Sequence, residues 1–348
     1  MFKPKYTISD KVIRQLTEIA VGRDVIERAK LVPKWELSLR KDALIHAAHS
    51  STHIEGNQLT LEEVSQLALG REVSAMRRDK QEVLNYLNVL SHLEKYLPKN
   101  DFSAALLLKV HKDLVRQALT NSADEGTFRN RAVVIGHRDE EGRTFVTFRP
   151  PPASAVPDIV QSFVSWLNHP QTEQIHPVLV AGIAHYEFVR IHPFIDGNGR
   201  TACVLATLIF FARGFDTRRF FALDDYYDSD RLAYYDALKS VNPKTLDLTC
   251  WLEYFCEGVA FTISRVREKI ELLSGGRYRG QTEPQISLTK RQTDIVETTG
   301  RLGKITSREM QTMFKISAQA VHKEIKKLLD QKVVRLVGKG RAAHYELN

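Results

Sequence analysis

The fold of this chain is decided by the stretch Ile191-His192-Pro193-Phe194-Ile195-Asp196-Gly197-Asn198-Gly199-Arg200-Thr201. The residues Gly197 to Gly199, called the glycine turn below, can adopt positive φ, and the missing side chains let a ligand approach the backbone. The run from Arg200 to Arg213 is apolar on nearly every face and stops at Gly214. It therefore predicts a buried helix whose N-terminus is the glycine turn.

The same stretch contains the parts of a site for phosphoryl or nucleotidyl transfer. Unpaired N–H groups and the positive end of a helix dipole make an anion site, and Arg200 adds a charged fork for phosphate oxygens. Asp196 is the hard oxygen ligand that a phosphate-bridging Mg²⁺ ion needs, and His192 is suited to be the general base for a hydroxyl. An isolated Gly-Asn-Gly is more often an ordinary turn. Here His192, Asp196, the glycine turn and Arg200 stand in one unbroken string before an apolar helix, which favours a phosphate site over an ordinary turn.

At this point a family resemblance is visible. His-Pro-Phe-x-Asp-Gly-Asn-Gly-Arg is the signature of the Fic family, and residues 192–200 resemble it residue for residue. The resemblance implies a mostly helical fold that uses ATP and Mg²⁺ to transfer AMP to a protein hydroxyl, with His192 as the base and Asp196 as the metal ligand. It also implies that Phe194 anchors the loop. The residues that it places around the nucleotide are Gly197, Asn198, Gly199, Arg200, Thr201, Ala202 and Cys203.

The resemblance breaks at one position. The family pattern usually carries a second arginine three residues after Arg200, where it holds the γ-phosphate, and this chain has Cys203 there. A thiol cannot replace the guanidinium fork. Two alternatives therefore stay open: a DNA-binding regulator with a weak Fic-like domain that senses a nucleotide or a partner, and an enzyme that transfers or removes another phosphate-linked group.

A second resemblance lies upstream, where residues 37–54 are predicted to form a helix that ends at Gly56. The segment from Ser51 to Gly56 resembles the inhibitory-helix motif of Fic proteins that regulate themselves. In that class a glutamate, here Glu55, obstructs the γ-phosphate by pairing with the second arginine. Since Cys203 stands in the partner position, Glu55 either pairs with Arg200 or another cation, or inhibits differently. Taken alone, Glu55 is a solvated residue near a helix C-terminus.

Four histidines outside the signature have simpler interpretations. His46, His49 and His53 are spaced to share one helix face, but no further metal-ligand pattern accompanies them. We interpret these three as polar helix surface rather than as a zinc site. His185 is interpreted as a packed helix residue.

Two β-rich runs, 132–135 and 144–148, are joined by polar residues and followed by Pro150 to Pro152, which predicts a hairpin. In Fic proteins a hairpin at this position, the flap, pairs with the backbone of the target protein, so the resemblance implies that residues 132–148 bind the target. A plain surface loop is the alternative. The resemblance further places Tyr235 beside the adenine, with core packing of Tyr234 and Tyr235 as the alternative.

We place the Fic-like domain at residues 37–274, after an N-terminal arm, residues 1–36, and apolar spacing predicts the remaining helices of both parts. These helices span residues 10–29, 60–70 (after a capping box at Thr60), 73–96, 104–119, 156–167, 176–190, 230–239 and 246–274.

The C-terminal segment differs in charge. Residues 286–348 hold 13 Lys and Arg against 6 Asp and Glu, a net charge of +7, after a glycine-rich linker at 275–285. Helices at 289–299, 307–314 and 317–331, with Ser307 and Ser317 as N-caps, and strands at 332–337 and 341–347 resemble a winged helix-turn-helix domain. The third helix and the hairpin would present these residues to DNA: Gln319, His322, Lys323, Lys326, Lys327, Lys339 and Arg341. A protein-protein or dimerisation module is the alternative.

Bulk composition restricts the class of protein. The chain has 348 residues, 43% of them hydrophobic, which suits a globular protein of two or three domains. The longest apolar run, Val204 to Ala212, is too short to span a membrane, and no secretory signal is recognisable. The three cysteines show no metal-ligand spacing. We therefore expect a cytoplasmic protein without a membrane partner, and leave a homodimer open.

Overall fold

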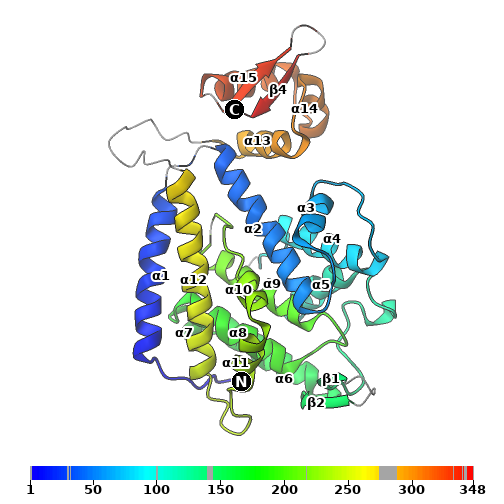
Figure 1. Ribbon diagram of the computed structural model, residues 1–348, viewed down its shortest axis with the longest axis vertical. Helices are drawn as coiled ribbons and strands as arrows, with labels where there is room; N and C mark the ends of the chain where they lie inside the picture. The colour runs from blue at the N-terminus through cyan, green and yellow to red at the C-terminus, as the bar shows by residue number, and fades with distance from the viewer. Residues whose placement is uncertain are drawn as a thin grey trace. The chain divides into compact units, whose positions relative to one another are not determined.

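The computed structural model describes residues 2–29, 31, 33–98, 101–138, 144–216, 218–273, 288–331, 333–338, 340 and 343–347. The chain divides into two compact units. The first unit is residues 1–23 with 43–264, and the second is 24–42 with 265–348. The fold is mostly helical, as the sequence predicts (Figure 1). The helices that run through both units are α1 (Asp10–Arg28), α2 (Pro33–Ile54) and α12 (Thr249–Leu273).

In the first unit, the predicted buried helix and the helix before it pack against each other. These are α8 (Pro177–Ile191) and α9 (Asn198–Ala212), which form the most extensive helix pair of the unit (Figure 1). The other helices of this unit are α3 (Leu61–Ala68), α4 (Arg77–Ser91), α5 (Ala104–Val115), α6 (Val156–Leu167), α7 (Pro170–Glu173), α10 (Asp224–Ser229) and α11 (Arg231–Lys239). Short 3₁₀ turns lie at Leu93–Tyr96, Ser122–Asp124 and Ala153–Ala155.

The packing of α8 against α12 depends on a glycine. A Cβ atom at Gly182 would lie 2.9 Å from side-chain atoms of both Leu252 and Phe255. The same close approach lets the Trp251 indole N–H donate to the Gly182 carbonyl at 2.8 Å. Nearly every residue of α8 is buried, because other elements cover it on several sides. This burial fixes the end of α8, where the signature stretch begins.

Two predicted helices end earlier than expected. The helix predicted at 73–96 is α4 followed by a separate 3₁₀ turn, because His92 leaves the helical conformation. The helix predicted at 104–119 ends at Val115, and Gln117 has φ of 58°, outside the helical region. The capping box at Thr60 is present as predicted. No helix in the described ranges is long and apolar enough to span a bilayer.

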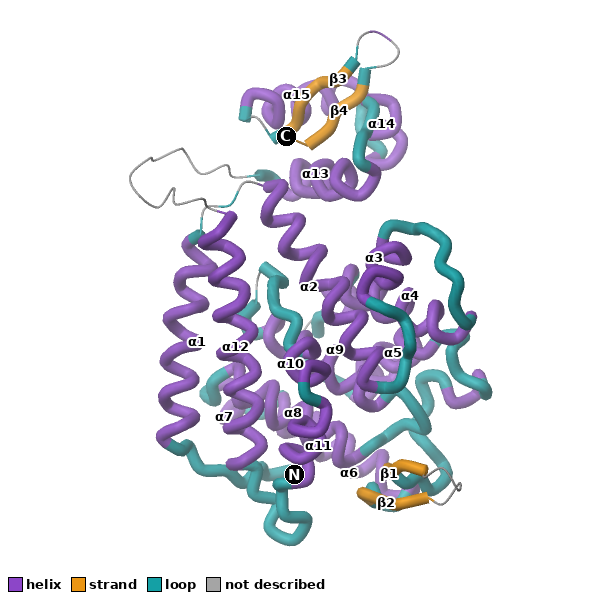
Figure 2. The backbone as a smooth tube through the Cα atoms, viewed as in Figure 1, coloured by secondary structure: helices purple, strands orange, loops and turns teal. Residues whose placement is uncertain are grey.

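The hairpin consists of β1 (Ile135–Arg138) and β2 (Thr144–Phe148), paired antiparallel (Figure 2). The second strand is confirmed, whereas the first begins three residues later than the start predicted at Ala132, because ladder pairing begins only where Ile135 lies opposite Phe148. The first strand also ends three residues later than predicted, because His137 and Arg138, expected in the turn, belong to β1. The rest of the turn, residues 139–143, lies outside the described residues.

The second unit contains the predicted C-terminal elements in their predicted order. They are α13 (Lys290–Leu302), α14 (Ser307–Phe314), α15 (Ala318–Asp330), β3 (Val334–Val337) and β4 (His344–Leu347), with the strands paired antiparallel. Its core is formed by Ile295, Val296, Ile305, Met310, Val321, Ile325, Leu328, Val333 and Val334. The linker at 275–285, Lys339 and Arg341 lie outside the described residues.

The helix caps of this unit confirm one prediction and correct another. Ser317 caps α15, as predicted. The cap of α14 is Thr306 rather than Ser307, because Thr306 forms a capping box with Glu309 three residues later.

Candidate functional site

The signature stretch forms a tight loop between α8 and α9. His192 ends α8 in the left-handed conformation, with φ of 49°, and Gly197 precedes α9 with φ of 74°. The helix begins at Asn198, two residues earlier than Arg200, where the sequence places its start. The Asn198 side chain ties the loop together, because it donates to the Phe194 carbonyl at 3.0 Å and accepts from the Phe194 N–H at 2.9 Å. Thr201 also holds the loop, through a hydrogen bond from its hydroxyl to the Gly197 carbonyl.

The residues predicted to contact the nucleotide differ in what they can offer a ligand. The Asn198, Thr201, Ala202 and Cys203 side chains are buried in the protein. The Thr201 N–H is also occupied, because it donates to the Gly197 carbonyl at 3.0 Å, so the first N–H groups of α9 are the backbone donors left for a ligand. The glycines of the turn have no side chain to stand in the way of a ligand.

Glu55 reaches the glycine turn. Its carboxylate accepts a hydrogen bond from the Gly199 N–H. A Cβ atom at Gly199 would collide with the Glu55 Oε1 atom, so only glycine allows this approach. Burial raises the pKa of the Glu55 carboxyl, while the Arg200 guanidinium opposes that rise. The carboxylate of Glu55 thus lies at the N-terminus of α9, where the positive charge of Arg200 favours its ionised form.

Asp196 and Arg200 belong to a network of charges. The Arg200 Nη2 atom lies 2.9 Å from Asp196 Oδ1, and Arg200 Nη1 lies 3.3 Å from Glu82 Oε1. Arg78 joins from α4, with its Nη2 atom 3.0 Å from Asp196 Oδ2 and its Nε atom 3.0 Å from Glu82 Oε1. Burial opposes the charge of Arg200, but the Glu55, Glu82 and Asp196 carboxylates outweigh it and raise the pKa of Arg200.

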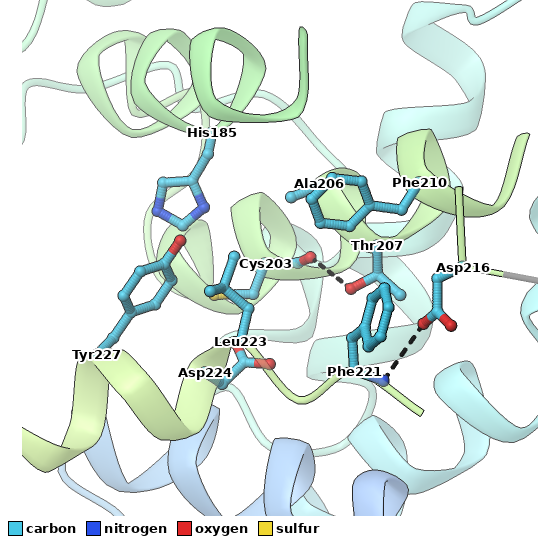
Figure 3. Close-up of a pocket in the computed structure, with 10 residues that line it drawn as sticks. All are labelled: His185, Cys203, Ala206, Thr207, Phe210, Asp216, Phe221, Leu223, Asp224 and Tyr227. Carbon is cyan, nitrogen blue, oxygen red and sulfur yellow. Dashed lines mark hydrogen bonds between the residues drawn. The ribbon is translucent and has the colours of Figure 1, made fainter. Parts of the chain in front are cut away.

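Cys203 faces a buried polar cluster in the first unit. Figure 3 shows its side chain with Asp224, Tyr227 and His185 around a cavity of about 10 Å³. Ser51, predicted to be part of the inhibitory motif, is buried and also interacts with Cys203 and Asp224. Burial raises the pKa of the Cys203 thiol far above its ordinary range, so the thiol is neutral at pH 7. Position 203 therefore adds no positive charge to the site.

His192 has the properties of a base. Burial, aided by the positive charge of Arg129, lowers its pKa to about 4, so the imidazole is neutral at pH 7. Its Nδ1 atom lies 3.3 Å from the Val189 carbonyl oxygen, which can only accept a hydrogen bond. The proton of the neutral ring is therefore on Nδ1, and the lone pair on Nε2 is available to accept another.

Two further residues hold the loop, and no sequence pattern predicts a role for either. Arg129 is buried and donates through Nε to the His192 carbonyl at 2.7 Å, and it also donates to the Pro151 carbonyl that follows the hairpin. His111 stacks on Phe194, with ring centroids 3.6 Å apart. The Gly126 N–H donates to His111 Nδ1, so His111 Nε2 carries the proton and donates to the Asp196 carbonyl at 3.0 Å.

The three histidines of α2 lie on a partly exposed polar face, and two of them have carboxylate partners that the sequence does not indicate. His46 Nδ1 lies 2.9 Å from Asp225, and His53 Nδ1 lies 2.8 Å from Asp228, so both pair with carboxylates of α10. All three are half-buried, because α10 covers this face of α2. His185 is a packed core residue as predicted, and Nε2 of its ring lies 2.9 Å from the Tyr234 hydroxyl oxygen.

The two tyrosines of α11 differ in exposure. Tyr234 is buried, whereas 39% of Tyr235 is exposed and its hydroxyl donates to the Ile54 carbonyl, one residue before Glu55, at 3.4 Å. An exposed ring near Glu55 is free to stack on a flat ligand, so the prediction for Tyr235 stands as an expectation.

Comparison with known proteins agrees with this geometry. Residues 101–210, which include the whole signature stretch, match the family model described as Fic/DOC. Among curated proteins, the protein adenylyltransferase Fic of Drosophila mojavensis is 25% identical over 255 residues, covering 68% of this chain and 47% of that protein. The protein of the same name from Drosophila grimshawi is 28% identical over 250 residues, covering 68% of this chain and 49% of that protein. The chain therefore spans about half the length of these curated relatives.

Solved structures share the fold. A Fic family protein from Desulfovibrio desulfuricans aligns with a TM-score of 0.65 at 23% identity, over 100% of this chain and 98% of that chain. Fic-1 from C. elegans aligns with a TM-score of 0.60 at 25% identity, over 75% of this chain and 73% of that chain. The chain contains a Fic domain with homology to Fic protein adenylyltransferases.

The protonation state of His192 can be measured directly. In a ¹⁵N NMR titration of histidine-labelled protein, assigned by comparison with His192→Ala, we expect His192 to remain neutral with its proton on Nδ1 at pH 5.5. An ordinary histidine, with a pKa near 6.5, would be about 90% protonated there. A midpoint near 6.5, or a proton on Nε2, would contradict the assignment of Nε2 as the proton acceptor.

Proposed function

We propose that this chain is a protein adenylyltransferase, which transfers AMP from ATP to a hydroxyl side chain of a target protein or of itself, and that Glu55 restrains it. The proposal rests on one observation: a single loop brings together a neutral His192, the Asp196 carboxylate and an anion-binding glycine turn. The homology to proteins named adenylyltransferases supports the same reaction.

The proposed chemistry follows from the position of the free His192 nitrogen. Nε2 accepts the proton of the target hydroxyl, and the hydroxyl oxygen forms a bond to the α-phosphorus of ATP. The bond from that phosphorus to the oxygen bridging to the β-phosphate breaks, and pyrophosphate leaves. AMP remains as an ester on the target, and His192 later releases its proton to water. The glycine turn and Arg200 hold the phosphate oxygens during this exchange.

The side chains fit a Mg²⁺ ion carried by the nucleotide. Asp196 is one partly exposed carboxylate, and the ion pair of its Oδ2 atom is with the exposed Arg78, which can move away. Mg²⁺ often takes one protein carboxylate together with phosphate oxygens and water, so Asp196 is sufficient as the protein ligand. Bound there, Mg²⁺ would neutralise phosphate charge. In the described part of the chain, no group of three or more His, Cys, Asp or Glu residues is placed to hold a metal by itself.

The restraint is a competition for the glycine turn. The Glu55 carboxylate and a nucleotide phosphate cannot both accept from the Gly199 N–H, and both are attracted to Arg200. Glu55 follows the last turn of α2, whose side chains are tied to α10 through His46 and His53. Productive ATP binding therefore requires the Glu55 side chain to leave, whereas α2 itself can stay in place.

The hairpin is the proposed docking site for the target protein. Its strand edge offers backbone groups for strand addition. Arg129 bonds both the His192 carbonyl and the Pro151 carbonyl just beyond β2, so one buried side chain joins the base of the hairpin to the catalytic loop. A target backbone held by the hairpin would therefore be held at a fixed distance from His192.

The proposal predicts an AMP adduct that intact-mass spectrometry can detect after incubation with Mg²⁺ and ATP. We expect self-modification in Glu55→Ala to exceed the wild-type level at least about tenfold, since removal of a charged competitor contributes on the order of 1.4 kcal/mol or more. Glu62→Ala, which removes an exposed glutamate of α3, is the matched control and should resemble wild type. The adduct should disappear in Glu55→Ala/His192→Ala. The absence of an adduct from all forms would count against the reaction.

A second proposed function is DNA binding by residues 286–348. On α15, Val321, Ile325 and Leu328 are buried, and the opposite face is polar and basic. All five predicted contact residues of this helix are exposed: Gln319, His322, Lys323, Lys326 and Lys327. This basic face and the net charge of +7 suit the major groove and phosphates of a duplex.

The DNA proposal predicts a salt-dependent affinity for duplex DNA, measured by fluorescence anisotropy. Because each phosphate contact contributes about 0.9 to the slope of log K against log salt, Lys323→Glu/Lys326→Glu should lower that slope by about two. Lys239→Glu, an exposed lysine of the first unit, should leave the slope unchanged. Equal affinities for both variants and wild type would favour the protein-protein alternative.

A further inference from the structure

We propose that Arg78, in the first turn of α4, binds the polyphosphate tail of the nucleotide. The inference rests on the proposed function, because it assigns a further contact to the same nucleotide. Nothing in the signature stretch indicates this residue, and α4 lies far from it in the sequence. The argument depends on how the charges around Asp196 are distributed.

The two guanidinium groups at Asp196 differ in their surroundings. The Arg200 side chain is 1% exposed and faces three carboxyl groups, those of Glu55, Glu82 and Asp196. The Arg78 side chain is 57% exposed, although it contacts the same Asp196 and Glu82 carboxylates. Arg200 is therefore fixed inside the protein, and Arg78 is the guanidinium that solvent, or a ligand entering from solvent, can reach.

The charge balance shows why a second cation is needed. Glu55, Glu82 and Asp196 are three carboxyl groups, and Arg78 and Arg200 are two guanidinium groups. The charge of Arg200 is already matched inside this network, and the neutral Cys203 thiol adds nothing. A polyphosphate therefore meets a site with little surplus positive charge once the glycine turn is filled by one phosphate group. Arg78 is the cation of this network that can leave Asp196 and bind a further phosphate group.

Moving Arg78 costs little. Ion pairs between exposed side chains contribute little to stability, because water screens the attraction and holding a long side chain in one position is unfavourable. A guanidinium also has five N–H donors, so Arg78 can keep its bond to Glu82 through Nε while Nη2 turns from Asp196 to a phosphate oxygen. The exchange would not require α4 to move.

The inference implies selectivity for the number of phosphates. A nucleoside monophosphate satisfies its single phosphate with the N–H groups of the glycine turn, so it gains nothing from Arg78. A nucleoside triphosphate has further phosphates that need a cation. Loss of Arg78 should therefore weaken ATP binding with or without Mg²⁺ and leave AMP binding unchanged, whereas a residue that merely holds Asp196, the proposed Mg²⁺ ligand, in place would affect ATP binding only when Mg²⁺ is present.

The test is isothermal titration calorimetry with ATP and with AMP, each with Mg²⁺ and separately in excess EDTA, in a Glu55→Ala background. We expect Arg78→Ala to raise the Kd for ATP about tenfold or more and to leave the Kd for AMP within about twofold, as loss of a charged hydrogen bond implies. Arg78→Lys should show a smaller loss, because lysine keeps the charge but not the fork. Arg77→Ala, the exposed neighbour, is the control and should match the parent.

The other outcomes are separable. A loss for ATP that appears only with Mg²⁺ would show that Arg78 only positions Asp196. An equal loss for ATP and AMP would show that Arg78 does not select the polyphosphate, and no loss for either would show that it has no part in binding. Each of these results overturns the inference while leaving the proposed function intact. If the Glu55→Ala parent with its native Arg78 binds no ATP, the proposed function fails and the assignment of Arg78 fails with it.

Discussion

The first N–H groups of α9 have no partner within their own helix, and this constraint organises the site. Such groups, together with the helix dipole, attract negative charge, and the Glu55 carboxylate supplies it by accepting from the Gly199 N–H. The same interaction explains the glycine, since any Cβ at position 199 would strike the carboxylate. A site built to bind an anion is thus filled by an anion of the protein itself. In the proposed function, inhibition and catalysis would depend on the same backbone groups.

The loop can present these groups because the surrounding structure holds it from several directions. Asn198 ties the loop to itself, His111 bonds the Asp196 carbonyl, and Arg129 bonds the His192 carbonyl. The packed helices α8 and α9 fix both ends of the loop. His192 remains neutral in these buried surroundings, which suits a proton acceptor, while the charged residues gather around Asp196 and Arg200. The buried packing thus separates the neutral base from the charged nucleotide end of the site.

The sequence predicts the parts of the site that are local in the chain and misses those that are not. His192, Asp196 and the glycine turn are neighbours, so their chemistry can be read from one string. Arg129 and His192 are 63 residues apart, and Arg78 and Asp196 are 118 residues apart, so no spacing rule brings them together. The carboxylate partners of His46 and His53 were missed for the same reason, since these α10 residues lie 175 residues or more away in the chain. The predicted ends of strands and helices were wrong where tertiary pairing decides the end, as it does at Ile135.

The central claim is that the Glu55 carboxylate and a nucleotide phosphate compete for one anion site. The most direct test is the Kd for ATP, measured by calorimetry in the wild-type chain and in Glu55→Gln, with Glu62→Gln as the control. The amide has the shape of the carboxylate without its charge, so the account predicts that ATP binds about tenfold more tightly to Glu55→Gln and with wild-type affinity to Glu62→Gln. Equal or weaker binding of ATP to Glu55→Gln would contradict it.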